Sequence, residues 1–167
     1  MKLRELRQKD APLMFEWMHD NSVVHYMGTD FSRKTLNDCY TFILSSQDDS
    51  LCVHRAIVDD NDEYMGTVSL KNIDKEKKTA EFAITVRKAA MGKGFSRYGM
   101  NEIIRIGFED YGLESIFWYV SKNNARAIRF YEKNGYKQVD CNMIYPEGQQ
   151  SKNYNWFIIR RPDILHG

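Results

Sequence analysis

The residues best suited to chemistry begin at positions 92–94, G-K-G, where two glycines bracket a lysine. The first N–H groups of a helix have no internal partner and carry partial positive charge, and glycine lets the backbone approach a phosphate closely. If a helix begins here, the turn can hold an anionic group, and Arg87, Lys88 and Arg97 add positive charge. A glycine turn before a helix is often only a tight turn, so the pattern alone leaves both interpretations open.

The neighbouring segments would position this turn. Period-2 alternation of Phe82, Ile84 and Val86 predicts a strand over residues 81–86. Beyond the turn, apolar residues recur at helical spacing along one face, namely Met100, Ile103, Ile104, Phe108 and Tyr111. The turn is therefore expected to join the end of a strand to the start of a helix.

A second group of polar residues follows on another predicted helix. Asn124 is a suitable helix N-cap, and Gly135 is a suitable C-terminal stop. Tyr131 follows Asn124 by seven residues, close to two helical turns, so the two side chains share a face. A tyrosine on a helix face is often a core residue, but a phenol can also donate a proton.

The remaining patterns predict a mixed architecture. The expected strands cover residues 2–7, 51–58, 63–72, 81–86, 115–121, 136–144 and 154–159, and early helices are expected to be capped by Asp10 and Ser32. Gly66 marks either a bulge or a close approach of two backbones. A helix between two strands implies a parallel crossover and short hairpins imply antiparallel pairing, so the sheet is mixed.

Composition limits the classes of partner. The 167 residues fit one domain over residues 1–167, and 24 basic and 23 acidic side chains nearly cancel, which predicts neither a nucleic-acid nor a membrane partner. No apolar run reaches the ~20 residues that span a bilayer. Three scattered cysteines without a C-x-x-C pair, and four dispersed histidines, predict reduced thiols, no metal site and a cytoplasmic protein.

Two segments together carry a family resemblance. The run R-K-A-A-M-G-K-G at 87–94 and the run N-N-A-R-A-I-R-F-Y-E-K-N-G-Y at 123–136 resemble the Gcn5-related N-acetyltransferase (GNAT) superfamily. The second run is the more specific, through Asn124, Ala127, Tyr131, Lys133, Gly135 and Tyr136. The resemblance implies a single-domain α/β (α+β) fold: a mixed, mostly antiparallel seven-stranded sheet, splayed between its fourth and fifth strands and flanked by about four helices. Acetyl-CoA would lie in the cleft.

The resemblance also implies where the cosubstrate binds. Its pyrophosphate loop would comprise Met91, Gly92, Lys93, Gly94, Phe95 and Ser96. The pantetheine would pair with the backbone at Ile84, Thr85 and Val86, Asn124 would contact the pantetheine arm, and Tyr131 would lie near the sulfur. The family usually has Gln or Arg three residues before the first glycine, where this chain has Ala89. Arg87 or Lys88 would have to compensate, or the backbone N–H groups and Lys93 carry more of the binding.

Acetyl transfer needs a neutral amine, an oxyanion site and a proton for the departing thiolate. An alkylammonium has a pKa near 10.4, so a base must deprotonate it, and Glu81 is the candidate, directly or through water. Glu81 could equally be a solvated strand carboxylate. Tyr131 is the candidate acid, and a backbone N–H at Ile84 or Thr85, where the family has a bulge, would meet the oxyanion.

The acceptor is less constrained. Residues 15–27 are similar to the same region in the branch of ribosomal-protein, diamine, and amino-sugar or sugar-nucleotide acetyltransferases, and the candidate pocket residues are Trp17, His25, Tyr26, Trp118 and Tyr145. The balanced charge favours a small-molecule primary amine as the acceptor. The amine would attack acetyl-CoA directly, in a ternary complex. The alternatives are an N-terminal protein acetyltransferase and a non-catalytic acyl-CoA sensor, and a homodimer stays open. A dinucleotide fold is disfavoured because its third glycine is Arg97 here.

Overall fold

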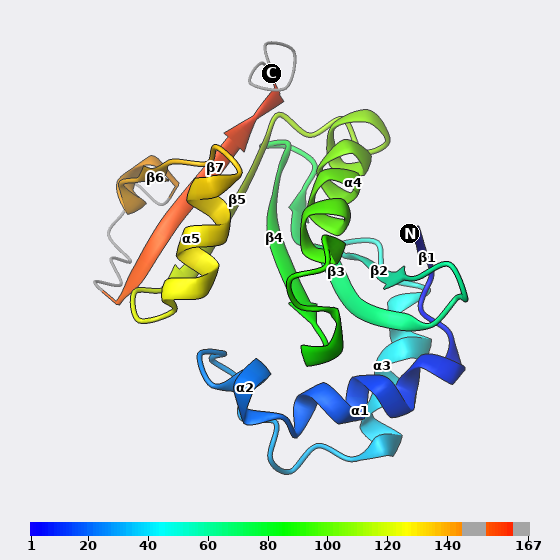
Figure 1. Ribbon diagram of the computed structural model, residues 1–167. Coiled ribbons are helices and arrows are strands. Elements are labelled where there is room, and N and C mark those ends of the chain that lie inside the picture. Colours follow the sequence, from blue (N-terminus) through cyan, green and yellow to red (C-terminus); the bar gives the residue numbers. More distant parts are fainter. Residues whose placement is uncertain (145–152, 162–167) are drawn as a thin grey trace.

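The computed structural model describes residues 1–144 and 153–161, with the helices packed on both faces of one sheet (Figure 1). The strands are β1 (Lys2–Arg4), β2 (Val53–Val58), β3 (Tyr64–Asp74), β4 (Thr79–Val86), β5 (Ser115–Ser121), β6 (Gln138–Val139) and β7 (Tyr154–Arg160). The helices are α1 (Ala11–Met18), α2 (Asn21–Val24), α3 (Leu36–Ser46), α4 (Phe95–Glu109) and α5 (Ala125–Lys133), with 3-10 turns η1 (Gln8–Asp10), η2 (Lys88–Ala90) and η3 (Cys141–Met143).

The sheet is mixed and splayed, as predicted. Its seven strands have the order β1-β2-β3-β4-β5-β7-β6, and within the described residues β4 and β5 form the one parallel pair. That pairing covers Thr79–Glu81 against Ser115–Phe117 and then stops. Beyond Glu81 the two strands diverge (Figure 1). The last residues of β4 therefore have an edge that no strand of the described chain occupies.

Two apolar layers fix the sheet between the helices. On one face, α4 packs on β2, β3 and β4 through a cluster that includes Met100, Ile103 and Phe108. On the other face, α1 and α3 pack together through a cluster that includes Met14 and Ile43. The glycine turn between β4 and α4 is thus held by a buried helix and a central strand.

The described residues contain five α-helices, close to the expected number of about four, and the shortest is the four-residue α2. Two other local expectations were wrong. Thr35, not Ser32, caps α3: its hydroxyl accepts from the Asp38 N–H at 3.1 Å, and the Asp38 carboxylate accepts from the Thr35 N–H at 2.8 Å. The strand expected over 136–144 is reduced to β6, because Asp140 accepts from the Asn142 N–H and begins η3.

Asp10 stands at the start of α1 but does not cap it. Its buried carboxylate accepts two hydrogen bonds from Arg4, both at 2.8 Å, and a third from the Arg7 N–H. The strand predicted over 2–7 ends at Arg4. A close approach at Gly66 is confirmed, since a Cβ there would lie 2.5 Å from the Thr85 carbonyl oxygen.

Candidate active site

A cavity of about 900 Å³ opens where β4 and β5 separate. One wall is β4 from Glu81 to Val86, continued by the glycine turn. The facing wall comprises β5 from Trp118 to Ser121 and one side of α5. Residues 26–29, after α2, close a third side. The strand, turn and helix that the sequence singled out therefore line one space.

The glycine turn has the geometry of an anion site. Gly92 and Gly94 have φ angles of 75° and 89°, which a side chain would strain. Gly94 is the N-cap of α4 and provides no side-chain cap, and the first α4 residue whose N–H bonds back to the turn is Tyr98. Within the described chain, the N–H groups of residues 95–97 have no hydrogen-bond partner. These donors, with the helix dipole, suit a phosphate.

Not every residue of the predicted loop faces the cavity. Met91, Gly92, Gly94 and Ser96 line it, as does Arg97. Lys93 is exposed outside the lining. The Phe95 side chain is buried in the core beneath α4, so this residue can offer only its backbone N–H.

Arg87 does not compensate for the alanine at position 89. Its guanidinium is buried and points away from the turn, with Nε and Nη2 each 3.1 Å from the Glu16 carboxylate. Nη1 donates to the Tyr64 carbonyl at 3.0 Å. Lys88 and Ala89 are exposed and lie outside the cavity lining. Backbone N–H groups and Arg97 are therefore what this chain presents to an anion at the turn.

Glu81 lies on the cavity wall and is paired. Its side chain is 12% exposed, and Oε2 lies 3.2 Å from the Nζ of Lys71, the residue opposite it on β3. Oε1 has no partner among residues 1–144 and 153–161. Glu81 thus has one oxygen held in place and one available for a proton.

Tyr131 reaches the cavity from α5 in a rigid aromatic setting. Its ring lies 5.4 Å from that of Trp118 and 5.2 Å from that of Phe157, centroid to centroid. Burial raises the pKa of the Tyr131 phenol well above its usual value of 10, and the neighbouring Tyr136 adds to this. The hydroxyl therefore stays protonated at neutral pH, which is the state of a proton donor.

Asn124 serves both its helix and the cavity. Its Oδ1 accepts from the Ala127 N–H at 3.2 Å and caps α5, as predicted. The same residue lines the cavity. Because the carbonyl oxygen is used in the cap, the amide N–H groups remain to donate to a ligand.

The comparisons with known proteins decide the family. A family model described as an acetyltransferase (GNAT) domain matches residues 1–137. The chain belongs to the GNAT acetyltransferase family. It is thus an acyltransferase that uses acetyl-CoA, and the open edge of β4 and the unpaired N–H groups of α4 fit a cosubstrate that combines a pantetheine arm with phosphates.

Two curated relatives cover most of this GNAT chain. Acetyltransferase PseH of Campylobacter jejuni is 25% identical over 136 residues, which span 81% of this chain and 82% of that protein. Spermidine N(1)-acetyltransferase of Escherichia coli K12 is 27% identical over 138 residues, 81% of this chain and 72% of that protein.

A solved structure shares the GNAT fold over nearly the whole chain. Spermidine N-acetyltransferase from Vibrio cholerae, in complex with CoA and spermine, superposes with a TM-score of 0.81 at 20% identity. The match covers 98% of this chain and 97% of that one. Another structure of the Vibrio enzyme is described as dodecameric. The fold prediction is confirmed.

One expected feature of the GNAT site is absent from the described strands. The β3–β4 ladder keeps a constant register from Gly66↔Val86 to Lys71↔Glu81, so β4 has no bulge at Ile84 or Thr85. The irregularity lies instead between Lys71 and Asp74. A backbone N–H can still face the cavity from the unpaired edge of β4, but no bulge turns it outward.

The acceptor candidates divide into three groups. Tyr26 and Trp118 line the cavity. Trp17 is buried and donates its indole N–H to Tyr64 at 3.0 Å, and His25 lies outside the lining, so neither contacts the cavity. Tyr145 lies outside the described residues. The structure also places residues there that the sequence analysis overlooked: Lys71, Tyr119, Arg126, Arg129 and Tyr154.

The sequence contained two indications of the overlooked cationic residues. Arg126, Arg129 and Lys133 are three and four residues apart, a spacing that places them along one side of α5. Lys71 is opposite Glu81 in the hairpin, a pairing that the length of the charged turn between the two strands could have indicated. No helix in residues 1–144 and 153–161 combines the length and the apolar character needed to cross a membrane.

Proposed function

We propose that this GNAT enzyme acetylates the primary amine of a small molecule, by direct attack of the amine on acetyl-CoA in a ternary complex. The observation that carries the proposal is that Glu81 and Tyr131 line opposite walls of one cavity, whose end is the glycine turn. A base and an acid on opposite sides of a cosubstrate cleft are what a single-step acyl transfer requires.

In this mechanism Glu81 and Tyr131 handle the protons. Glu81 Oε1 takes a proton from the ammonium group of the acceptor, directly or through water. The Lys71 ammonium keeps the Glu81 carboxylate oriented. The amine nitrogen attacks the thioester carbonyl, and a backbone N–H of Ile84 or Thr85 faces the oxyanion. As the C–S bond breaks, the Tyr131 hydroxyl donates its proton to the departing thiolate, and the second proton that leaves the nitrogen returns to the Tyr131 oxygen, directly or through water.

The proposed cosubstrate contacts follow the cavity lining. Backbone N–H groups at Gly94–Ser96, with Met91 and Gly92, would hold the pyrophosphate, and Ile84–Val86 would pair with the pantetheine. The Asn124 amide would contact the pantetheine arm. Lys93 and Phe95 remain in the proposed loop through their backbone only.

Charge in the cavity favours an acceptor that is neutral or anionic apart from its amine. Five cationic side chains line it, Lys71, Arg97, Arg126, Arg129 and Lys133, and among the described lining residues Glu81 is the one carboxylate. A polyamine carries several positive charges and needs several anionic partners. An amino sugar, in particular one linked to a phosphate or nucleotide, avoids this repulsion. A polyamine is the second candidate, supported by the similarity to the spermidine N(1)-acetyltransferase of Escherichia coli.

The test is an acceptor screen with thiol detection. Purified protein and acetyl-CoA would be offered amino sugars, nucleotide-linked amino sugars, polyamines and N-terminal peptides. We expect thiol release with the sugar amines and at least tenfold lower kcat/KM with spermidine. Fastest turnover with spermidine would reverse the acceptor ranking. Binding of acetyl-CoA without turnover on any amine would favour the sensor alternative, and no binding at high micromolar concentration would refute the acetyltransferase assignment for this chain.

A further inference from the structure

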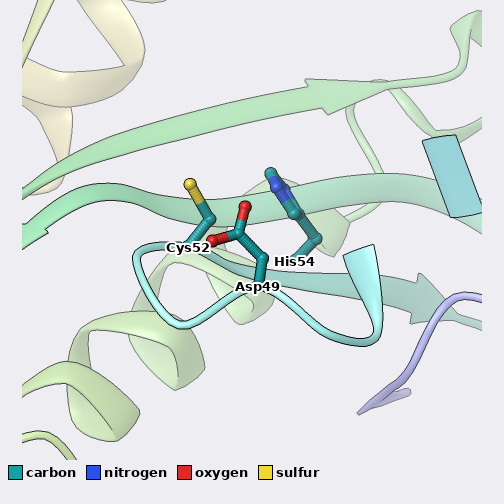
Figure 2. A group of neighbouring side chains, drawn as sticks. All are labelled: Asp49, Cys52 and His54. Atoms are coloured by element: carbon teal, nitrogen blue, oxygen red, sulfur yellow. The ribbon is translucent and has the colours of Figure 1, made fainter. Parts of the chain in front are cut away.

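Three side chains of different chemistry converge at the start of β2. Asp49, Cys52 and His54 each provide one ligand atom, and these atoms all lie within 4.8 Å of one another. Figure 2 shows the three side chains projecting side by side, with the Asp49 carboxylate between the Cys52 sulfur and the His54 ring. In the part of the chain that the structure describes, this is the one such group. None of the three lines the acetyl-transfer cavity.

Two of the three side chains, Asp49 and His54, are already oriented by a neighbour. The Asp49 Oδ1 accepts from the Leu51 N–H at 2.8 Å, and the Asp49 carboxylate also interacts with the Cys52 thiol. The His54 Nδ1 lies 2.6 Å from the buried Ser69 hydroxyl, and the ring packs edge-on against Phe42. Hydrogen bonds of this kind fix the ring and its tautomer in metal sites, and they leave Nε2 for the metal.

The charged groups around the cluster come from several elements. The Asp49 carboxylate lies near both Cys52 and His54, Lys71 acts on both from β3, and Arg55 acts on His54. The Lys71 ammonium is itself paired with Glu81, with Nζ 3.2 Å from Oε2.

We propose that Asp49, Cys52 and His54 bind Zn²⁺ through Oδ2, Sγ and Nε2, with water as the fourth ligand. Nitrogen, sulfur and oxygen ligands in a tetrahedron are the usual zinc environment, and three protein ligands leave one open position. At zinc bond lengths the ligand atoms would stand about 3.3 to 3.7 Å apart. Because the ligand atoms lie within 4.8 Å of one another, they need to approach by at most about 1.5 Å. The Cys52 proton is released to solvent on binding.

The sequence alone did not indicate this site. All three ligands come from six residues, D-S-L-C-V-H at 49–54, but the motif lacks a C-x-x-C or H-x-x-x-H pair. Strand geometry creates the site: residues 52 and 54 project to the same face, and the turn before β2 folds Asp49 back over them. The expectation of no metal rested on the scattered cysteines and the dispersed histidines, each taken separately, and did not consider mixed ligands.

Cobalt is the probe, because a thiolate bound to Co²⁺ gives a near-ultraviolet charge-transfer band. Metal-free protein, kept reduced, would be titrated with Co²⁺ and then with Zn²⁺. We expect one equivalent of Co²⁺ to saturate the band and Zn²⁺ to abolish it by displacement. C52S should lose the band entirely. C141S is the matched control, since Cys141 lies on η3 outside the cluster, and it should match the wild type.

Two further variants separate a built site from adventitious binding. S69A keeps all three ligands and removes only the partner of His54, and it should weaken the apparent Co²⁺ affinity about 10- to 100-fold. D49N should weaken it by at least as much. Circular dichroism of each metal-free variant checks that the fold is intact. A band that needs many equivalents of Co²⁺, that persists in C52S, or that is unchanged in both S69A and D49N would overturn the proposal.

Discussion

Replacing Tyr131 with phenylalanine removes one oxygen from a ring whose packing stays the same. The contacts with Trp118, Phe157 and Phe130, at centroid distances of 5.2 to 5.4 Å, involve the ring and not the hydroxyl. Within the described residues that hydroxyl has no hydrogen-bond partner. We therefore expect Y131F to change the free energy of unfolding by less than about 1 kcal/mol. Any loss of turnover then reports on chemistry rather than on folding.

The expected loss of turnover is large. Proton transfer by a positioned side chain contributes roughly 10²- to 10⁴-fold, so kcat should fall by that factor, or about 2.7 to 5.4 kcal/mol of barrier. The affinity for CoA should stay within about threefold, since the ring still lines the cavity. Initial rates of thiol release at saturating substrates give kcat, and calorimetry gives the affinity.

The matched control for Y131F is Y136F. Tyr136 also packs against Trp118, with ring centroids 5.1 Å apart, but it does not line the cavity. Y136F should keep wild-type kcat. If Y131F retains wild-type kcat, or if Y136F loses as much, Tyr131 is not the acid and the assignment of the two cavity walls to acid and base fails.

Three other perturbations test the site and the fold. E81Q should lower kcat and remove the acidic limb of the pH profile of kcat, whereas K71M should keep that limb. An unchanged pH profile in E81Q would exclude Glu81 as the base. G94A places a side chain at φ 89°, so it should lower the free energy of unfolding measured in denaturant by about 1 to 2 kcal/mol and should weaken CoA binding. A variant as stable as wild type would mean that the turn adapts. Hydrogen bonds from Lys9 and then from Arg4 hold the pKa of the Asp62 carboxyl well below its usual 3.8. The stabilisation of the fold by these interactions is therefore complete above pH 3.8 and is lost as the pH falls below that value. The melting temperatures of wild type and D62N should differ at pH 7 and converge below about pH 4; a constant difference would refute the linkage.

Local features of the site were predictable because short-range rules fix them. The strand ending at Val86, the left-handed glycines and the Asn124 cap each depend on residues within one or two turns of chain. The same rules were sufficient for the Thr35 and Asp38 capping box, which the choice of Ser32 overlooked. The splay of the sheet came from the family resemblance and not from periodicity.

What the sequence could not supply depends on contacts between distant segments. Arg87 was expected to face the turn, but its partner Glu16 lies 71 residues away on α1. The pairing of Lys71 with Glu81 depends on the register of β3 against β4. The cavity lining includes Tyr26, which its local sequence pattern could not separate from Trp17, a core residue.

The ion pair between the buried Arg87 and the exposed Glu16 joins two parts of the enzyme. Arg87 follows the last residue of the strand that would carry pantetheine, and Glu16 belongs to the helix that leads into the acceptor wall. In sequence, Glu16 precedes residues 23–29, a segment that contributes part of the cavity lining and that we propose contacts the acceptor. We expect that this segment can be exchanged with that of a relative, transferring acceptor preference while the cosubstrate half keeps its geometry. Acceptor specificity can then change between relatives while the residues proposed for acetyl transfer stay the same.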